Sequence, residues 1–96
     1  MNRTEWVKAL RSGEWTQCRH YMYNTRDNSF CCLGVACRLI KPMEDYKEQE
    51  SAFRVMREHY GIGRYTAFKL ADMNDSQRKT FTEIADYIET LPEVTD

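Results

Sequence analysis

The sequence predicts a mainly α-helical domain, with four or five short helices and one possible small β-hairpin. Apolar residues recur at helical spacing in several segments. Glycine, proline and capping residues separate these segments, and one aromatic segment followed by turn residues fits a hairpin. The chain has 96 residues, of which 42% are hydrophobic and 30% charged. These values are typical of one compact globular domain covering residues 1–96.

The first helix is expected over residues 3–12. Its apolar side chains share one face: Trp6, Val7 and Leu10. Asn2 and Glu5 have the spacing of a capping box, although that motif normally begins with Ser or Thr. Gly13 is well placed to end the helix in a left-handed conformation.

An aromatic segment and a turn follow this helix. Tyr21 to Tyr23 could form a short strand, and "NTRDNS" over residues 24–29 is typical of a turn. Phe30 and Cys31 could form the return strand. Together these residues predict a small β-hairpin.

The cysteine-rich segment 32–40 is predicted to be a helix. Its buried stripe follows helical spacing: Cys32, Leu33, Ala36, Cys37 and Ile40. Pro42 ends the helix. Gly34 costs about 1 kcal/mol of helix propensity relative to alanine. We therefore expect either close approach of another backbone at Gly34 or a helix that begins later.

Two helices are expected in the next part of the chain, after a charged connection or first helical turn at residues 43–50. The first covers 51–60, with these side chains inward: Ala52, Phe53, Val55, Met56 and Tyr60. Gly61 can take the left-handed position that ends it, with Ile62 folding back on the core. The second covers 65–73 and buries Ala67, Phe68, Leu70 and Met73.

The residues "NDSQRK" at 74–79 are expected to interrupt the helical pattern before the last helix. Thr80 and Glu83 form a predicted capping box at its start. Its apolar stripe is Phe81, Ile84, Ala85 and Ile88. Pro92 follows its end.

The four cysteines allow three interpretations. Their spacings of 13, 1 and 5 residues lack the paired pattern of zinc ligands, so a site built from Cys18 and His20 with later cysteines is an alternative only. A helix N-terminus favours a thiolate, which makes Cys31 or Cys32 a candidate nucleophile for a small cysteine-dependent enzyme. The interpretation we favour is that the cysteines are small, buried core residues.

The cellular compartment is predicted from the lack of a signal peptide and of a membrane-spanning segment in the sequence. It contains no apolar segment of a signal peptide, and no apolar run approaches the roughly 20 residues that span a bilayer. We expect a cytoplasmic protein without membrane contact. Thiols stay reduced there, which argues against disulfides between the cysteines.

Charge is distributed unevenly along the chain. Residues 1–42 carry seven Lys and Arg against three Asp and Glu (+4), and residues 43–96 carry seven against twelve (−5). This asymmetry fits either a partner surface or an ordinary solvated exterior. A helix-turn-helix pattern spans residues 73–89, but its second helix directs Glu83, Asp86 and Glu89 outward, where they would repel phosphates. We therefore do not expect sequence-specific DNA binding.

A candidate binding face lies between the first helix and the hairpin turn. Odd-numbered positions of an extended segment share one side, which groups aromatic, amide and guanidinium side chains, and a turn arginine extends the group. Such a face could stack on a base and pair with phosphate. Its residues are Trp15, Gln17, Arg19, Tyr21, Tyr23 and Arg26.

Three sequence blocks resemble a group of small uncharacterised proteins encoded by bacteriophages and prophages. The blocks are "W…ALRSGEWTQ", "FCCLGVAC" and "LADMND…FTEIADYIE", and they span nearly the whole chain. Members are often longer, Ser76 and Gln77 stand where the family has a glycine-containing turn, and Arg38 stands where the family has Asp after the cysteine. The resemblance implies a phage origin. It places no catalytic role on any residue.

From these observations we expect a non-enzymatic host-interaction or anti-defence factor without a cofactor. It would inhibit or sequester a bacterial protein or a signalling nucleotide, and the nucleotide version would need a homo-oligomer to wall off a pocket. The alternatives are the cysteine enzyme and a zinc-stabilised interaction module. The candidate partner-binding residues are Trp15, Gln17, Arg19, Tyr21, Tyr23, Arg26, Cys31, Asn74 and Asp75.

Overall fold

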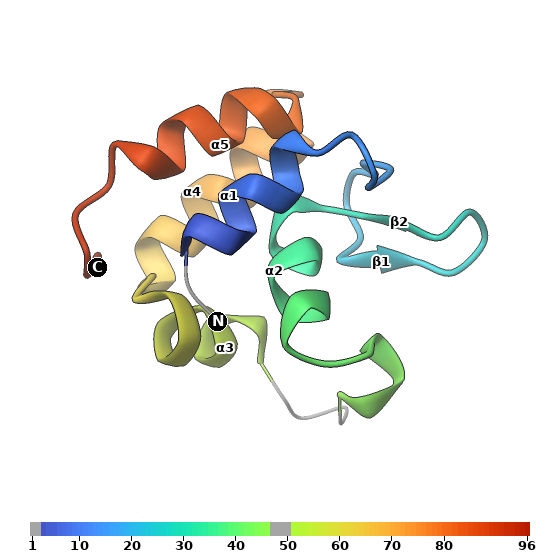
Figure 1. The fold of residues 1–96 in the computed structure, drawn as a ribbon, viewed down its shortest axis with the longest axis horizontal. Coiled ribbons are helices and arrows are strands. Elements are labelled where there is room, and N and C mark those ends of the chain that lie inside the picture. Colours follow the sequence, from blue (N-terminus) through green and yellow to red (C-terminus); the bar gives the residue numbers. More distant parts are fainter. Residues whose placement is uncertain (1–2, 47–50) are drawn as a thin grey trace.

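The computed structural model describes residues 3–46 and 51–96. Within these ranges the chain forms five α-helices, one 3-10 turn and a two-stranded antiparallel hairpin (Figure 1). The predicted fold class, mainly α with a small hairpin, is confirmed. In chain order the elements are α1 (Arg3–Arg11), β1 (Tyr23–Asn24), β2 (Ser29–Phe30), α2 (Cys32–Ile40), η1 (Met43–Asp45), α3 (Ala52–Tyr60), α4 (Arg64–Asp75) and α5 (Phe81–Glu89).

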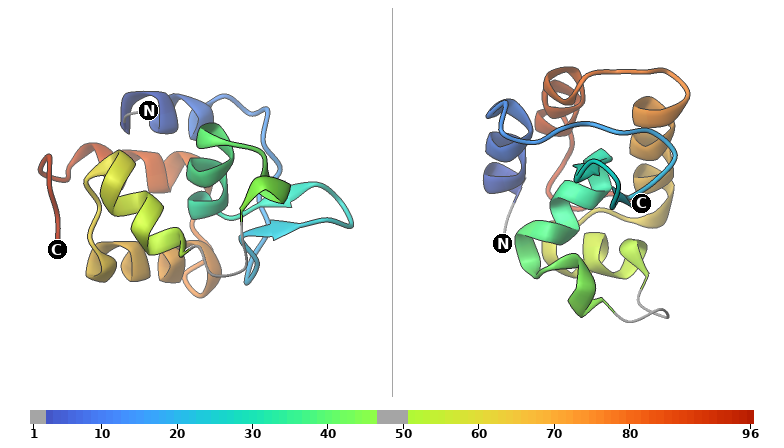
Figure 2. Two further views of the ribbon diagram at one scale, coloured as in Figure 1. Left: turned by 90° about the horizontal axis from the view of Figure 1, so that it is seen from below. Right: turned by 90° about the vertical axis from the view of Figure 1, so that its right-hand side faces the viewer.

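Helix α2 is the centre of the domain. It packs against α1, α3 and α4, and α1 also packs against α5 (Figure 2). All residues from 32 to 37 are buried. The Trp6 indole donates a hydrogen bond to the Cys32 carbonyl (3.0 Å), and the Tyr60 hydroxyl donates to the Ala36 carbonyl (2.6 Å). The apolar stripe predicted for this helix therefore faces the core, with Ile40 half-buried at its end.

Most helix ends lie where the sequence predicts them. Gly13 (φ +77°) and Gly61 (φ +68°) take left-handed conformations, and Ile62 is fully buried behind Gly61. Thr80 and Glu83 form the expected capping box. The other predicted capping pair includes Asn2, which lies outside the described residues. Local capping chemistry thus sets these boundaries.

Gly34 permits the closest backbone approach in this region. A Cβ atom at this position would lie 1.9 Å from the Met22 carbonyl oxygen. The Cys31 amide donates to the same oxygen (3.2 Å), so the hairpin segment lies directly on the first turn of α2. The expectation of close approach is confirmed. The alternative of a later helix start is not, because α2 begins at Cys32.

Two predictions about α4 are wrong. The helix runs from Arg64 to Asp75 instead of ending at Met73. Asn74 lies on the buried face and finds hydrogen-bond partners there, which offsets its low helix propensity. Phe68 was expected inward but is 57% exposed. The helix buries Thr66 and Asn74 in addition to the three predicted apolar residues.

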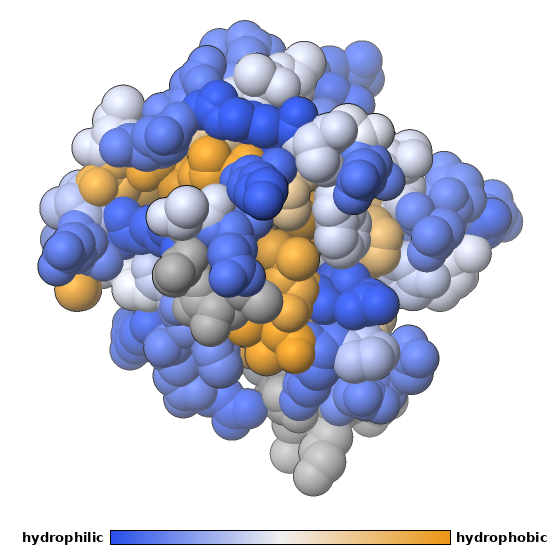
Figure 3. Space-filling view, viewed as in Figure 1, coloured by the Kyte–Doolittle hydropathy of each residue, from blue (hydrophilic) through white to orange (hydrophobic). Residues whose placement is uncertain are grey.

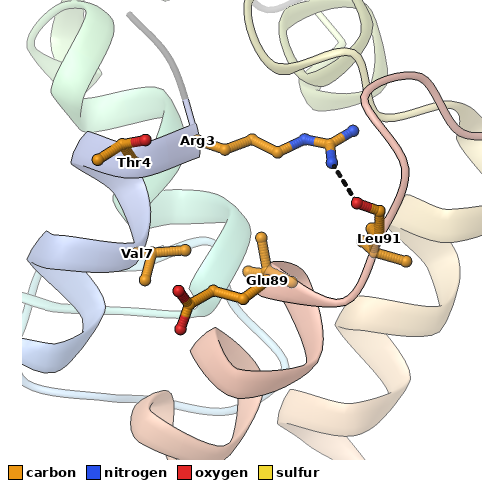
Figure 4. A pocket seen from close by; sticks show the side chains of 6 residues that line it. Arg3, Thr4, Val7, Glu89 and Leu91 are labelled. Carbon is orange, nitrogen blue, oxygen red and sulfur yellow. Dashed lines mark hydrogen bonds between the residues drawn. The ribbon is translucent and has the colours of Figure 1, made fainter.

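Arg3 joins the start of α1 to the C-terminal segment. Its guanidinium group donates to the carbonyls of Tyr60 (2.9 Å) and Glu93 (2.7 Å). It also donates to the Leu91 carbonyl (3.3 Å; Figure 4). Nearby, Arg11 forms ion pairs with two acidic residues of α5, Asp86 and Glu89. α1 is therefore held to α5 by Arg11 and to the segment after α5 by Arg3. None of the helices in the described ranges is long and apolar enough to cross a membrane.

Candidate functional site

The three sequence blocks meet at a buried polar cluster beside the start of α2. We call Gln17, Asn74 and Asp75, with the main chain of Cys18 and Cys32, the polar cluster. Asn74 is fully buried. Its carboxamide oxygen accepts from the Gln17 side chain (2.8 Å) and from the Cys32 amide (3.2 Å). Its NH₂ group donates to the Cys18 carbonyl (2.9 Å) and to Asp75 (2.8 Å).

The hydrogen bonds of the polar cluster hold separate segments of the chain together. Asn74 uses two donors and two acceptors, which is the whole hydrogen-bonding capacity of a carboxamide. Gln17 also donates to the Lys79 carbonyl (2.8 Å), and Asp75 accepts from the His20 amide (2.9 Å). These bonds fix the segment before the hairpin against α2 and α4. Asn74 therefore lies in the core with its hydrogen-bonding capacity used within the chain, and its assignment to a binding surface stays a prediction.

The cysteines of α2 lie in surroundings that disfavour the thiolate. Cys31 is the N-cap residue, and its sulfur accepts a hydrogen bond from the Gly34 amide (3.4 Å). Burial nevertheless raises the pKa of Cys31 to about 11. Burial also raises the pKa of Cys32, which is fully buried, and raises the pKa of Cys37 to about 12. A protonated, buried thiol is a poor nucleophile at neutral pH.

The zinc alternative finds no support in the described part of the chain. No group of three or more His, Cys, Asp or Glu residues within it is arranged to hold a metal ion. All four cysteines are free thiols. Cys18, the half-buried one, donates from its sulfur to the Tyr21 carbonyl (3.3 Å).

The predicted binding face before the hairpin forms only in part. Gln17 pairs with Phe30 in a parallel bridge. The rings of Trp15 and Tyr23 lie 5.0 and 4.8 Å from the Phe30 ring, so these residues gather around it. His20 has a positive φ of 72°. This turn breaks the strict alternation on which the prediction of one continuous face depended.

The remaining residues of that face are more scattered. Tyr21 is 62% exposed. Arg26 lies exposed in the hairpin turn, where its amide donates to the Asn24 side chain. Arg19 is half-buried, and its Nε has no hydrogen-bond partner within the described ranges.

A groove of about 460 Å³ lies beside the Trp15 and Phe30 rings. Glu14 and Asp27 line it together with Arg38. The two carboxylates oppose binding of a phosphate group. The predicted stacking platform therefore exists at Trp15, but the basic partner groups that a nucleotide needs are not gathered around it.

A second groove lies on the opposite side of the domain from the hairpin, between α1 and α5. Val7, Ile88 and Leu91 give it an apolar floor, and Arg3 and Glu89 stand at its rim (Figure 4). Its volume is about 290 Å³. Apolar side chains reach the surface between these two helices (Figure 3). The groove offers contact area, without a set of polar groups that would select a ligand.

The most distinctive exposed chemistry lies on α3 and α4. We call five residues the arginine–phenylalanine surface: Phe53, Arg54, Arg57, Arg64 and Phe68. The two helices lie side by side (Figure 2). The Phe53 and Phe68 rings are 4.7 Å apart, and the Arg64 guanidinium lies 5.1 Å from the Phe53 ring centre. Tyr65, 73% exposed, extends the aromatic area along α4.

This surface is also hollowed and positively charged. Phe53 and the three arginines line a groove of about 460 Å³, with Glu58 as its acidic residue. Arg57 and Arg64 form no ion pair with any residue of the described ranges. The sequence interpretation missed this surface because Phe53 and Phe68 were assigned to the core. The arginines at positions 54, 57 and 64, close to these phenylalanines in the sequence, could have indicated an exposed binding surface.

Comparison with known proteins adds a family without a known activity. No curated protein and no solved structure matches the chain. The model of a domain of unknown function, DUF8296, matches residues 2–65, which is about two thirds of the sequence. The chain belongs to the DUF8296 family.

Proposed function

We propose that this chain is a non-catalytic binding protein of bacteriophage type. It acts in the bacterial cytoplasm as a host-interaction or anti-defence factor that inhibits or sequesters a host protein. The observation that carries the proposal is the exposed Phe68 ring, which contacts the half-buried Phe53 ring beside three arginines on α3 and α4. The phage-type role rests on the resemblance of the three sequence blocks.

The composition of the arginine–phenylalanine surface supports a protein partner. Aromatic and arginine side chains are enriched at the centres of protein interfaces, where they contribute most of the binding free energy. Exposed aromatic rings in contact with each other are uncommon on a surface that binds nothing. The partner therefore presents an apolar pocket for Phe68 flanked by carboxylates that face Arg57 and Arg64.

Two observations favour this function over the alternatives. Burial raises the pKa of both candidate nucleophiles, Cys31 and Cys32, which opposes a cysteine-dependent enzyme. The groove that contains Trp15 carries two carboxylates, which opposes sequestration of a signalling nucleotide there. A protein partner requires neither an activated thiol nor an enclosed pocket.

Affinity capture from bacterial lysate tests the proposal with matched variants. We expect the wild-type chain to retain one host protein in stoichiometric amount, with native mass spectrometry reporting the mass of the complex. The double variant Arg64→Ala, Phe68→Ala should weaken the complex at least tenfold, because truncation of a hot spot costs about 2 kcal/mol or more. Lys8→Ala is the control, since Lys8 is exposed on α1 and lies outside the arginine–phenylalanine surface.

The possible results separate the hypotheses. Equal capture by the wild type and the double variant would remove the arginine–phenylalanine surface from the function. Extra mass that matches a nucleotide, with no protein bound, would overturn the proposal in favour of nucleotide sequestration. Turnover of a substrate that is lost with Cys31→Ser would overturn its non-catalytic part.

A further inference from the structure

The geometry around β2 places two cysteines next to each other. Phe30 donates its amide to the Thr16 carbonyl (2.8 Å) and accepts from the Cys18 amide (2.9 Å), which is the pattern of a parallel ladder. Gln17 and Phe30 are the paired residues. The next pair in the same register is Cys18 and Cys31.

The direction of the side chains brings the two thiols to one side. Side chains alternate along extended segments. Gln17 and Phe30 therefore point to one face of the ladder, while Cys18 and Cys31 point to the other. Neighbouring strands lie about 4.8 Å apart, which is within the Cα separation of about 4.4–6.8 Å that a disulfide needs. The backbone of Cys31 is extended, with φ −83° and ψ 175°, as the register requires.

We propose that Cys18 and Cys31 form an oxidation site that a peroxide converts into an intramolecular disulfide. The half-buried Cys18 thiol is the first target, since Cys31 is buried. Peroxide transfers one oxygen atom to Cys18, which becomes a sulfenic acid with release of water. The Cys31 sulfur then attacks the Cys18 sulfur, and a second water leaves as the disulfide forms. The two thiols lose two electrons in total, which the peroxide accepts.

One contact of Cys31 favours the second step, although burial slows the attack by keeping this thiol protonated at neutral pH. The Gly34 amide at the start of α2 already points at the Cys31 sulfur (3.4 Å). It can stabilise the negative charge that develops on this sulfur as its proton leaves. Cys18 also contributes, after burial and Asp75, to the raised pKa of Cys31, as expected for two neighbouring sulfurs. Cys32 points elsewhere, because its thiol donates to the Leu70 carbonyl on α4 (3.5 Å).

The disulfide would close the base of the hairpin. Residues 19–30 would lie inside the loop, so β1, the turn and β2 would be tied to the start of α2. The resting protein has all four thiols free, in agreement with a reducing compartment. The site therefore responds only when oxidant is present.

Thiol counting on the full chain tests the proposal. The folded protein is treated with hydrogen peroxide, unfolded, and labelled with a maleimide. We expect four labelled cysteines before treatment and two after it, with the tryptic peptides 12–19 and 27–38 joined by a bond that reductant cleaves. Cys37→Ser should keep the cross-link, whereas Cys18→Ser and Cys31→Ser should lose it. Serine at position 31 can still cap α2, so this variant should remain folded.

Three results would overturn the proposal. The first is four labelled cysteines after treatment of the folded wild type. The second is a cross-link that persists in Cys18→Ser. The third is the same mixture of disulfides from the folded chain as from the urea-unfolded chain, because the inference requires the fold to select this pair.

Discussion

The start of α2 and the outer face of α3 and α4 differ in whether their side chains bond within the chain or are exposed to solvent. At the start of α2, Asn74 is fully buried and makes four hydrogen bonds within the chain. On the outer face, Phe68 exposes 57% of its surface and Arg64 stacks over Phe53. The first region holds the chain in place, and the second offers chemistry to a partner. From residue type alone, the polar Asn74 would be expected at the surface and the apolar Phe68 in the core.

The largest expected effect comes from breaking the first region at Asn74. Asn74→Ala removes the carboxamide and leaves its partners without their hydrogen bonds, among them the Cys32 amide and the Cys18 carbonyl. Each unsatisfied buried group costs about 1–3 kcal/mol, so we expect a loss of about 3–5 kcal/mol in the free energy of unfolding. Urea unfolding followed by circular dichroism measures it. Gln17→Ala is the smaller matched change, and a loss below about 1 kcal/mol for Asn74→Ala would contradict the structural role.

The next effect concerns the backbone contact beside the polar cluster. In an exposed helix, glycine-to-alanine substitution stabilises by about 1 kcal/mol. Gly34→Ala should instead destabilise by about 2–3 kcal/mol, because its Cβ would collide with the Met22 carbonyl oxygen. Gly13→Ala is the control, since a Cβ there meets no atom within 4 Å and only its φ of +77° is strained. A more stable Gly34→Ala variant would show that the hairpin segment does not lie on α2.

Alkaline pH should weaken the first region by a smaller amount. The folded pKa of Cys31, about 11, lies above the usual value of 9.0. As pH rises above 9, the unfolded thiol ionises first, so stability present below pH 9 is lost on the way to pH 11. We expect Cys31 to account for about 1 kcal/mol of the loss between pH 8 and pH 10. Cys31→Ser should remove that part of the slope in urea unfolding, and an unchanged slope would place Cys31 in contact with water.

The smallest effect on stability is expected on the outer face. Phe68→Ala should change the free energy of unfolding by less than about 0.5 kcal/mol, as for other exposed substitutions. Phe81→Ala, at the buried start of α5, should cost about 3–5 kcal/mol. Thermal unfolding of both variants makes this comparison. A large loss for Phe68→Ala would mean that this ring belongs to the core and would weaken its assignment to a binding surface.

The sequence predicts the helices well because their signals are local. Apolar spacing places α1, α2 and α5. Capping residues place helix ends: Thr80 begins α5 and Gly61 ends α3. The hairpin also follows from adjacent residues. These features depend on neighbours along the chain, which the sequence displays directly.

The candidate site was harder to predict because it depends on contacts between distant segments. "ND" at positions 74 and 75 is typical of a turn, yet Gln17 and Cys32 supply partners that keep both residues in α4. Phe68 has the residue type of a core position, but the helix orientation set by Leu70 and Ala67 turns it outward. Which face a short helix buries is decided by the helices around it.

The contact between α1 and α5 has a consequence for the order in which the protein folds. Val7 is buried beside Ile88 where α1 packs against α5, and about seventy residues separate the two helices along the chain. During synthesis α1 emerges from the ribosome well before α5, so its apolar face has no final partner until α5 follows. Contacts between distant segments also slow folding. The newly made chain therefore passes through an interval in which Val7 is open to chaperones and proteases, and the arrival of α5 ends that interval.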